Sequence, residues 1–347
     1  MRCIRPTTND QRPTTILETK YYIAGPCAAE SREQVRRIAQ AILHLQGTAV
    51  IFRAGIWKPR TSPTTFQGIG QIGLSWLREI ETDFGLPCMT EVATPEQLRL
   101  ALEAGLTRFW IGARTSADPQ AVQAIANAID ERVRLIAIKN PVNEDLDLWL
   151  GNIQRLEARN ERLQVIAVHR GCDHRPCWGM AYKLHQLRPD IPLLLDPSHL
   201  SGKAEDVPAL MATAEALGLN GTMVEVHDRP QEALSDGRQQ LLPEEWAQQV
   251  RRTDVPCTKE EERELLWLRL QIDEIDKRLW ESLAQRMEIV RSIGAVKKAY
   301  HLNAYQPDRY QQLLTQRLLW AQEKGLPTEV VQPILEAIHE AAIKLQR

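Results

Sequence analysis

The sequence predicts an α/β (β/α)8 (TIM) barrel over residues 1–250, a linker over 251–263, and an all-helical domain over 264–347. Three observations support this division. The chain of 347 residues is longer than one average domain. Strand-like and helix-like runs alternate eight times before about residue 250, which is the length of such a barrel. The remainder has helical patterns only. A doubly wound open sheet is the alternative for the first part, but it usually carries fewer strands.

The predicted strands are short runs rich in apolar and β-branched residues, separated by turn residues. In chain order they are Tyr22–Ala24, Ala49–Arg53, Pro87–Glu91, Arg108–Gly112, Leu135–Lys139, Gln164–His169, Leu193–Asp196 and Thr222–Val226. Helices are predicted between them at Glu33–Leu45, Pro95–Ala104, Ala121–Ile129 and Ala204–Leu217. Thr94 as N-cap and Pro95 as the first helical residue mark one of these starts.

The tail after the charged segment 251–264 is predicted to form three helices. Pro307 and Pro327 interrupt the helical pattern and divide it into Glu262–Ala299, Asp308–Lys324 and Thr328–Leu345. The two shorter helices cannot bury the long first helix alone. We therefore expect a second copy to pack along it, giving a homodimer or a higher homo-oligomer.

The charge and cysteine content exclude several classes of protein. Lys plus Arg is 43 and Asp plus Glu is 45, a net charge of −2, which argues against a general nucleic-acid or membrane-surface binder. No apolar run is long enough for a membrane span, and the first residues do not resemble a signal peptide. Six scattered cysteines do not form a disulfide framework, so a cytoplasmic location is predicted.

A glycine motif at residues 68–73 matches the G-x-G-x-x-G pattern of dinucleotide-binding sites, and Glu91 follows at a suitable distance. That pattern requires its first glycine directly after a strand. Here the predicted strand ends near Arg53 and a proline-rich loop intervenes. The motif is therefore interpreted as a glycine-rich stretch between a loop and a helix.

Polar side chains follow every predicted strand, at the end of the barrel where active sites lie. In order they are Cys27, Arg53, Glu91, Arg114 (after Gly112-Ala113), Lys139, His169-Arg170, Asp196 with His199, and Glu225 with His227. The cations among them, with two more from the loop after Arg53, are Arg53, Lys58, Arg60, Arg114, Lys139 and Arg170. Several cations converging in one place need anions, so phosphates or carboxylates, and two phosphorylated substrates, are expected.

Four of the strand-end and loop residues form a mixed donor set for a metal. Cys27, His199, Glu225 and Asp236 offer a thiolate, an imidazole and two carboxylates, which suits Mn²⁺, Fe²⁺, Co²⁺ or Zn²⁺. A local alternative is a zinc site made by His169, Cys172, His174 and Cys177. Its spacing matches no finger or ribbon pattern.

The segments IAGPCAAES, FRAGIWKPRTSPTTFQGIG, WIGARTS, LLLDPSH and MVEVH resemble the 3-deoxy-D-arabino-heptulosonate 7-phosphate (DAHP) synthases over residues 20–250. These enzymes open the shikimate pathway, and the resemblance is to the short subfamily close to the KDO 8-phosphate synthases. It implies condensation of phosphoenolpyruvate with erythrose 4-phosphate on a divalent metal, with Mn²⁺ as first choice. The stretch Lys-Pro-Arg-Thr at 58–61 separates this family from its KDO relatives.

The resemblance also implies a role for each matching residue. The metal ligands would be Cys27, His199, Glu225 and Asp236. The phosphoenolpyruvate pocket would contain Arg53, Lys58, Glu91, Arg114, Lys139 and Arg170, with the backbone of Gly112 and Ala113. The aldose phosphate would be held by Lys58, Arg60, Thr61 and Asp196. Lys58, Lys139 and His169 are the candidate catalytic side chains, and the proton carrier is left open between His169 and a water at the metal.

The long tail helix carries an apolar stripe that two cations continue. The stripe comprises Leu268, Ile272, Ile275, Leu279, Leu283, Val290 and Ile293. Arg286 and Lys297 continue it and lie eleven residues apart, about three turns, so they share a face. Cations in such a stripe either extend to solvent at its edge or bind a buried anionic ligand.

The pattern LRLQIDEIDKRLWESLAQR…VKK resembles the all-helical chorismate mutases, which convert chorismate to prephenate. Arg269, Arg286, Lys297, Arg309 and Gln346 match the active-site positions of that family. Arg269 lies about 100° around the helix from Arg286, in keeping with the family pattern in which it reaches the partner's site. Lys297 and Gln346 would stabilise the ether oxygen. Gln306 and Tyr310 stand where bacterial relatives often carry acidic residues.

The chain is therefore predicted to be a bifunctional enzyme in which prephenate, bound by the tail, inhibits the synthase. The alternative is a synthase whose helical tail only senses a ligand and dimerises.

Overall fold

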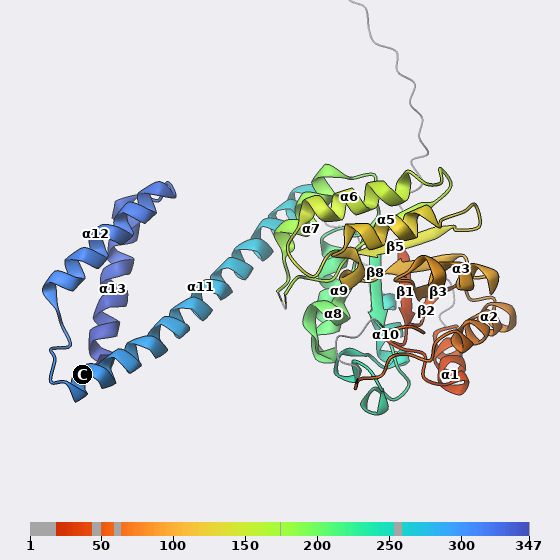
Figure 1. Ribbon diagram of the computed structural model, residues 1–347, viewed down its shortest axis with the longest axis horizontal. Helices are drawn as coiled ribbons and strands as arrows, with labels where there is room; N and C mark the ends of the chain where they lie inside the picture. Colours follow the sequence, from red (N-terminus) through yellow and green to blue (C-terminus); the bar gives the residue numbers. More distant parts are fainter. Residues whose placement is uncertain (1–18, 44–49, 59–63, 174, 253–258, 347) are drawn as a thin grey trace, which may run out of the picture. The chain divides into compact units, whose positions relative to one another are not determined.

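The computed structural model describes residues 19–43, 50–58, 64–173, 175–252 and 259–346 (Figure 1). It confirms an α/β barrel followed by a helical region. The chain divides into two compact units, residues 1–271 and 272–347, which are treated separately below. None of the described helices combines the length and the apolar content needed to cross a bilayer.

Eight parallel strands close into a barrel, with β1 hydrogen-bonded to both β2 and β8. The strands are β1 (Tyr21–Gly25), β2 (Val50–Arg53), β3 (Cys88–Glu91), β4 (Arg108–Ile111), β5 (Leu135–Lys139), β6 (Gln164–His169), β7 (Leu193–Leu195) and β8 (Gly221–Glu225). All eight predicted strands are confirmed to within one residue at each described end. Closure of the sheet excludes the doubly wound alternative.

Helices surround the barrel (Figure 1). They are α1 (Arg32–Leu43), α2 (Ile72–Phe84), α3 (Pro95–Glu103), α4 (Ala113–Ser116), α5 (Pro119–Asn127), α6 (Leu146–Glu157), α7 (Trp178–Leu187), α8 (Pro197–Ser201), α9 (Val207–Ala216) and α10 (Pro243–Arg252). Within the described residues, 3₁₀ turns lie at η1 (Ala204–Asp206), η2 (Pro230–Glu232) and η3 (Gly237–Gln239).

Capping residues explain where two of these helices begin. The predicted Thr94 cap is confirmed, since its hydroxyl accepts a hydrogen bond from Gln97 N at 3.2 Å. Helix α5 begins earlier than predicted because Asp118 caps it, accepting from Gln120 N at 2.9 Å and Ala121 N at 3.2 Å. The helix predicted from Ala204 is in fact a 3₁₀ turn followed by α9.

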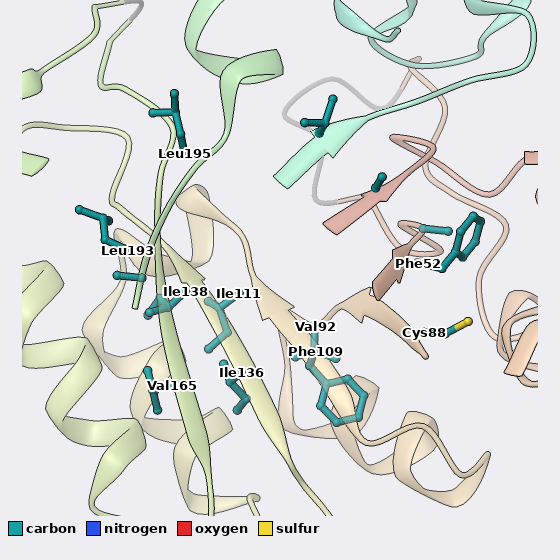
Figure 2. Close-up of a cluster of buried hydrophobic side chains, with 14 of the residues drawn as sticks. Phe52, Cys88, Val92, Phe109, Ile111, Ile136, Ile138, Val165, Leu193 and Leu195 are labelled. Atoms are coloured by element: carbon teal, nitrogen blue, oxygen red, sulfur yellow. The ribbon is translucent and has the colours of Figure 1, made fainter. Parts of the chain in front are cut away.

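The strands separate two apolar layers, because successive side chains point to opposite faces. Outward-facing residues such as Phe52, Phe109 and Ile136 pack under the helices (Figure 2). Inward-facing residues such as Ile23, Met89 and Trp110 fill the barrel interior in a second cluster. The interior is therefore packed, as in other barrels of this type, and leaves the polar side chains to the ends of the strands.

The first turns of the long tail helix, α11 (Glu260–Ala299), belong to the barrel unit. Trp267 is buried there, with ring centroids 5.9 Å from Trp178, 5.8 Å from Tyr182 and 6.3 Å from His185. Tyr182 also donates a hydrogen bond to the Glu264 carboxylate at 3.2 Å. An aromatic cluster thus holds the beginning of α11 against α7.

Replacing Trp267 by alanine should destabilise the barrel unit. A buried Trp→Ala change typically lowers the free energy of unfolding by about 3–5 kcal/mol through lost burial and the cavity left behind. Leu187→Ala, at a position of α7 that is 61% exposed, is the matched control and should change it little. Denaturant unfolding followed by tryptophan fluorescence and circular dichroism measures both. Equal stability of the two variants would show that the aromatic cluster does not hold α11.

Unit 2 contains the rest of α11 together with α12 (Pro307–Glu323) and α13 (Thr328–Gln346). The three predicted helices are confirmed, and α12 packs against α13 (Figure 1). Helices α11 and α13 approach closely at Gly294, where a Cβ atom would lie 2.9 Å from the Cα of Gln346. The predicted apolar stripe is exposed within one chain at Ile272, Ile275 and Leu279, whereas Val290 is buried.

Candidate functional site

Inward-facing positions of the barrel strands change from apolar to polar at the carboxyl ends. Ile51, Met89, Ala137, Val168, Leu194 and Met223 belong to the inner core or pack against it. The residues two positions further along, on the same face of each strand, are Arg53, Glu91, Lys139, Arg170, Asp196 and Glu225. Alternation therefore directs all six predicted site residues to the same mouth of the barrel.

A pocket at this mouth contains most of the predicted phosphoenolpyruvate-binding residues. Its lining is Arg53, Glu91, Trp110, Gly112, Ala113, Arg114, Lys139, Val142, Arg170 and His199. An adjoining pocket shares Arg114, Val142, Arg170 and His199 and continues along Gly171–Asp173 and Arg175. The cations lining the two pockets come from the ends of β2, β4, β5 and β6, so an anion bound there would be contacted from several strands.

Arg53 is the most buried cation of the pocket. Its guanidinium lies over the Trp110 ring at 4.7 Å and donates to Glu225 Oε1 at 3.1 Å. The remaining nitrogens, Nε and Nη1, are buried and have no hydrogen-bond partner among the described residues. Because unpaired buried donors are costly, these two nitrogens are suited to a carboxylate or phosphate of a bound substrate.

Asp196 organises the floor of the pocket. Its carboxylate accepts from Lys139 Nζ at 2.5 Å and from the backbone N–H of His199 at 3.0 Å. Burial alone would raise the pKa of Asp196, but His199 and Lys139 hold it well below its usual range. Asp196 is fully buried. The structure thus has it hold Lys139 and His199, and its contact with the aldose phosphate stays a prediction.

The four predicted metal ligands come together beside the pocket. Cys27 Sγ and carboxylate oxygens of Glu225 and Asp236 lie within 4.8 Å of one another. Asp236 Oδ2 is 2.9 Å from Cys27 Sγ, and His199 Nε2 is 3.7 Å from Glu225 Oε1. A thiol, an imidazole and two carboxylates at these separations fit a borderline divalent cation.

Burial and the neighbouring charges set the protonation of this group. Burial, then Glu225, raises the pKa of the Cys27 thiol to about 12, although Lys58 Nζ lies 2.9 Å from the sulfur. Burial would lower the pKa of Lys58, but Cys27, Glu225 and Glu91 outweigh it and raise the pKa. A cation that binds here must therefore displace the thiol proton.

Gly112 is required by the position of Glu91. A Cβ atom at residue 112 would lie 2.1 Å from Glu91 Oε1, so any other residue would displace this carboxylate from the pocket wall. The backbone of Gly112 and Ala113 then forms the start of α4 beside Arg114. Both residues line the pocket, and the use of their backbone by phosphoenolpyruvate stays a prediction.

His169 is not among the residues that line the two pockets, and its role as a proton carrier stays a prediction. It is out of phase with the inward-facing positions of β6 and packs between Trp149 and Trp178, with centroids 6.4 and 5.7 Å away. Its Nε2 lies 2.7 Å from the Pro176 carbonyl oxygen. Burial lowers the pKa of His169 to about 4, so the imidazole is neutral at pH 7.

Some predicted residues cannot be placed. Arg60 and Thr61 lie outside the described residues, as does His174 of the alternative zinc site. Cys172 and Cys177 of that site are described, and both are buried free thiols. Among the described residues, the group with metal-binding geometry is that of Cys27, Glu225 and Asp236.

Two buried amides support the site and were not predicted. Asn140 accepts a hydrogen bond from Arg170 N at 2.7 Å and donates to Gly171 O at 2.9 Å, joining the loops after β5 and β6. Gln240 accepts from Cys27 N at 3.0 Å and donates to Ser235 O at 2.9 Å. Asn140 could have been predicted as a site residue because it directly follows Lys139 at a strand end. Nothing in the sequence near Gln240 indicates its role.

Unit 2 carries the second set of predicted residues. Arg286 is half-buried, and its Nη1 has no hydrogen-bond partner among the described residues. Lys297 Nζ donates to Ala304 O at 2.6 Å. Gln306 precedes α12, Arg309 is exposed on it, and Tyr310 stacks on His339 with centroids 4.0 Å apart.

The remaining two residues of this set lie in different units. Gln346 ends α13, and its Oε1 is buried without a partner among the described residues. Arg269 is exposed and lies on the part of α11 that belongs to the barrel unit. The structure therefore associates Arg286, Lys297 and Gln346 with unit 2, and Arg269 with unit 1.

Comparison with protein families assigns a model to each part of the chain. Residues 18–256 match the DAHP synthetase I family, and residues 268–347 match the family model of chorismate mutase type II. A phospho-2-dehydro-3-deoxyheptonate aldolase of Thermotoga maritima is 32% identical over 235 residues, covering 63% of this chain. The chain spans 64% of the length of that relative.

Other relatives carry a different name. A 2-dehydro-3-deoxyphosphooctonate aldolase of Helicobacter pylori is 26% identical over 268 residues, which are 69% of this chain and 94% of the relative. Among solved structures, the Thermotoga maritima phospho-2-dehydro-3-deoxyheptonate aldolase superposes with a TM-score of 0.59 at 27% identity. The superposition covers 67% of this chain and 68% of that one.

Proposed function

This chain belongs to the DAHP synthetase I family, and from that premise we propose that its barrel condenses phosphoenolpyruvate with erythrose 4-phosphate. The observation that carries the proposal is the cationic pocket containing the unpaired nitrogens of Arg53, directly beside the donor set of Cys27, Glu225 and Asp236. We propose the synthase site within residues 1–250 and the second activity within 264–347, joined by 251–263.

Substrate binding in the barrel depends on the cations. Arg53, Arg114 and Arg170 neutralise the phosphate and carboxylate of phosphoenolpyruvate, and Asp196 holds Lys139 Nζ toward the same pocket. Holding both substrates in one orientation removes much of the entropic barrier to their reaction. Lys58, kept protonated by its anionic neighbours, offers an ammonium at the boundary with the donor set.

A divalent cation held by Cys27, His199, Glu225 and Asp236, Mn²⁺ being our first choice, would act as a Lewis acid on the aldehyde carbonyl. In the condensation C3 of phosphoenolpyruvate bonds to the aldehyde carbon, and the aldehyde oxygen takes up a proton. Water adds to C2 and gives up a proton, and the C2–O bond breaks to release inorganic phosphate. In this proposal the Lys58 ammonium, 2.9 Å from Cys27 Sγ, hydrogen-bonds the oxygen that gains charge.

The length of the aldose phosphate, four or five carbons, is the main point to be tested. A heptonate is built from the three carbons of phosphoenolpyruvate and a four-carbon aldose, whereas an octonate needs a five-carbon one. The higher identity to the heptonate aldolase and the Lys-Pro-Arg-Thr stretch favour erythrose 4-phosphate. Rates of phosphoenolpyruvate consumption should be compared with erythrose 4-phosphate and arabinose 5-phosphate. Preference for the five-carbon substrate would refute this choice.

For unit 2 we propose the rearrangement of chorismate to prephenate. Support comes from the family match and from Arg286, Lys297 and Gln346, which are gathered in this unit. The reaction needs no proton transfer, so fixed cations around a compact conformer are sufficient. The alternative is a tail that binds its ligand without turning it over. A chorismate disappearance assay on the purified full chain separates the two.

We also propose that the chain is at least a homodimer and is cytoplasmic. Apolar side chains of α11, among them Ile275 and Leu279, are exposed in a single chain, and a second copy would cover them. Six cysteines without a disulfide framework agree with a reducing compartment. Sedimentation of the purified chain tests the dimer.

We expect prephenate to inhibit the condensation several-fold in the full chain. The physical reason is that one helix, α11, both packs on the barrel through Trp267 and carries Arg286. Prephenate bound in unit 2 would then weaken substrate binding in the barrel, and substrates bound in the barrel must weaken prephenate binding by the same factor as prephenate weakens theirs. Synthase rates measured against prephenate concentration check the expectation.

Two controls define the source of this inhibition. A chain ending at Gln271 keeps the Trp267 cluster but lacks unit 2, and Arg286→Ala keeps unit 2 but lacks a proposed ligand contact. Both should lose the inhibition while retaining synthase activity. If the shortened chain is inhibited as strongly as the full one, the helical tail is not the sensor.

A further inference from the structure

Three buried polar atoms of unit 2 have no hydrogen-bond partner among the described residues: Arg286 Nη1, His339 Nε2 and Gln346 Oε1. Each unpaired buried group of this kind costs about 1–3 kcal/mol unless water or a ligand satisfies it. His339 and Gln346 lie seven residues apart on α13, two turns, and so share a face. Gln346 is the residue that meets α11 at Gly294, between Arg286 and Lys297. The unpaired atoms therefore belong to one α11–α13 interface.

Three cations act on this interface, while two carboxylates, Glu336 and Glu340, act on Tyr310 beside it. Burial, followed by repulsion from Arg317 of α12, lowers the pKa of Arg286. Burial, followed by the charges of Arg286, Lys297 and Arg317, lowers the pKa of His339. Within the described part of the chain, none of these three cations lies within 4.0 Å of a carboxylate oxygen of a side chain. Three cations from two helices thus lack an anionic partner, as expected of a binding site for an anion.

Two tyrosines fix the imidazole of His339. Tyr310 stacks on it at 4.0 Å with an interplanar angle of 26°, and Tyr305 meets it edge-on at 5.9 Å and 62°. These contacts cover one face of the ring and hold its orientation, and therefore the direction of Nε2. Tyr310 stands where an acidic residue is common in the resembling family, and its stacking gives it a different role in this chain.

We propose that His339 is a substrate-binding residue of unit 2, and that with Arg286 it contacts a carboxylate of chorismate. In this arrangement His339 Nε2 donates a hydrogen bond to the carboxylate, and Arg317 contributes to the positive potential that attracts it. Tyr310 is a positioning residue that acts through His339. The inference rests on the proposed mutase function, because the ligand is taken from it, but the residues themselves were identified from the geometry of unit 2.

The test uses the full chain and four variants. His339→Leu removes the donor at similar volume, and we expect KM for chorismate to rise about 10-fold or more, the usual effect of losing a hydrogen bond to a charged group. His339→Gln keeps an N–H donor and should restore most of the affinity. Arg317→Gln should also raise KM about 10-fold. Arg291→Gln, an exposed arginine of α11, is the matched control and should leave KM unchanged.

Prephenate titrated by calorimetry gives the dissociation constant independently of turnover, and circular dichroism reports folding. If the unaltered chain binds prephenate but does not convert chorismate, the proposed mutase function fails. The inference on binding is then tested by prephenate affinity alone. Weaker binding in His339→Leu supports it, and unchanged binding overturns it. If His339→Leu does not fold, the inference is decided by KM and prephenate affinity in Arg317→Gln and in His339→Gln. KM and prephenate affinity within twofold of the unaltered chain in folded His339→Leu and Arg317→Gln would overturn the inference.

Discussion

Cys27→Ala should lower the kcat of the condensation by about 10³-fold or more. The change removes the only thiol of the donor set, which lies 2.9 Å from Asp236 Oδ2. Lewis-acid stabilisation is worth several kcal/mol, and each 1.36 kcal/mol corresponds to about tenfold in rate. Phosphoenolpyruvate consumption measures the rate, and elemental analysis after dialysis measures bound metal. Both should fall, and chelator should abolish the activity of the unaltered chain.

Cys88→Ala is the matched control for this prediction. Cys88 is also a buried thiol of the barrel unit, but it belongs to the outer apolar layer (Figure 2) and not to the donor group of Cys27, Glu225 and Asp236. Its loss should leave the metal content and the rate close to those of the unaltered chain. Full activity of Cys27→Ala, or of the unaltered chain with chelator, would show that the condensation does not need this metal site.

The barrel and most of its site could be predicted because strand alternation has a fixed period. A buried parallel strand that ends in a charged residue, such as Leu135–Lys139, indicates both the strand and the end at which the charge lies. Once eight such strands close into a barrel, residues far apart in the sequence must meet at one mouth. Cys27, Glu225 and Asp236 are brought together in this way.

A list of residues at the strand ends does not show which of two neighbours faces the barrel interior, or how deeply a side chain is buried. His169 ends β6 and Arg170 follows it, but only one of two adjacent residues can face the interior, and that residue is Arg170. Counting back to inward-facing Val168 and Ile166 would have separated them. Asp196 has the correct phase, yet it is buried under Lys139 and His199, and sequence alone does not give depth.

Residues on the short helices were harder to predict. Arg317 and His339 come near Arg286 only when α12 and α13 pack with α11, and no short motif encodes that packing. Arg286 and Lys297 could be found because both lie on one helix, where a spacing of eleven residues is sufficient to place them on one face.

Replacing Arg286 or Lys297 by alanine should each lower mutase kcat by at least about 10²-fold. Each change removes a fixed cation or hydrogen-bond donor from a site that works by electrostatic stabilisation alone, and loss of one such donor typically costs about 10²–10³ in rate. The condensation rate should stay unchanged without prephenate, since its residues lie in the other unit. Arg278→Ala, an exposed arginine of α11, is the control and should retain mutase activity.

The same variants test whether the mutase site is shared between subunits. Arg269 lies in the barrel unit on α11 and is exposed, whereas Arg286 lies in unit 2. If Arg269 completes the site of a partner copy, Arg269→Ala alone should be as inactive as Arg286→Ala. A mixture of the two variants should regain activity, because a mixed dimer contains one site with both arginines. Mixing should restore up to about a quarter of the original rate when subunits exchange randomly. If exchange is verified and no activity returns, each subunit carries its own complete site, and Arg269 has another role.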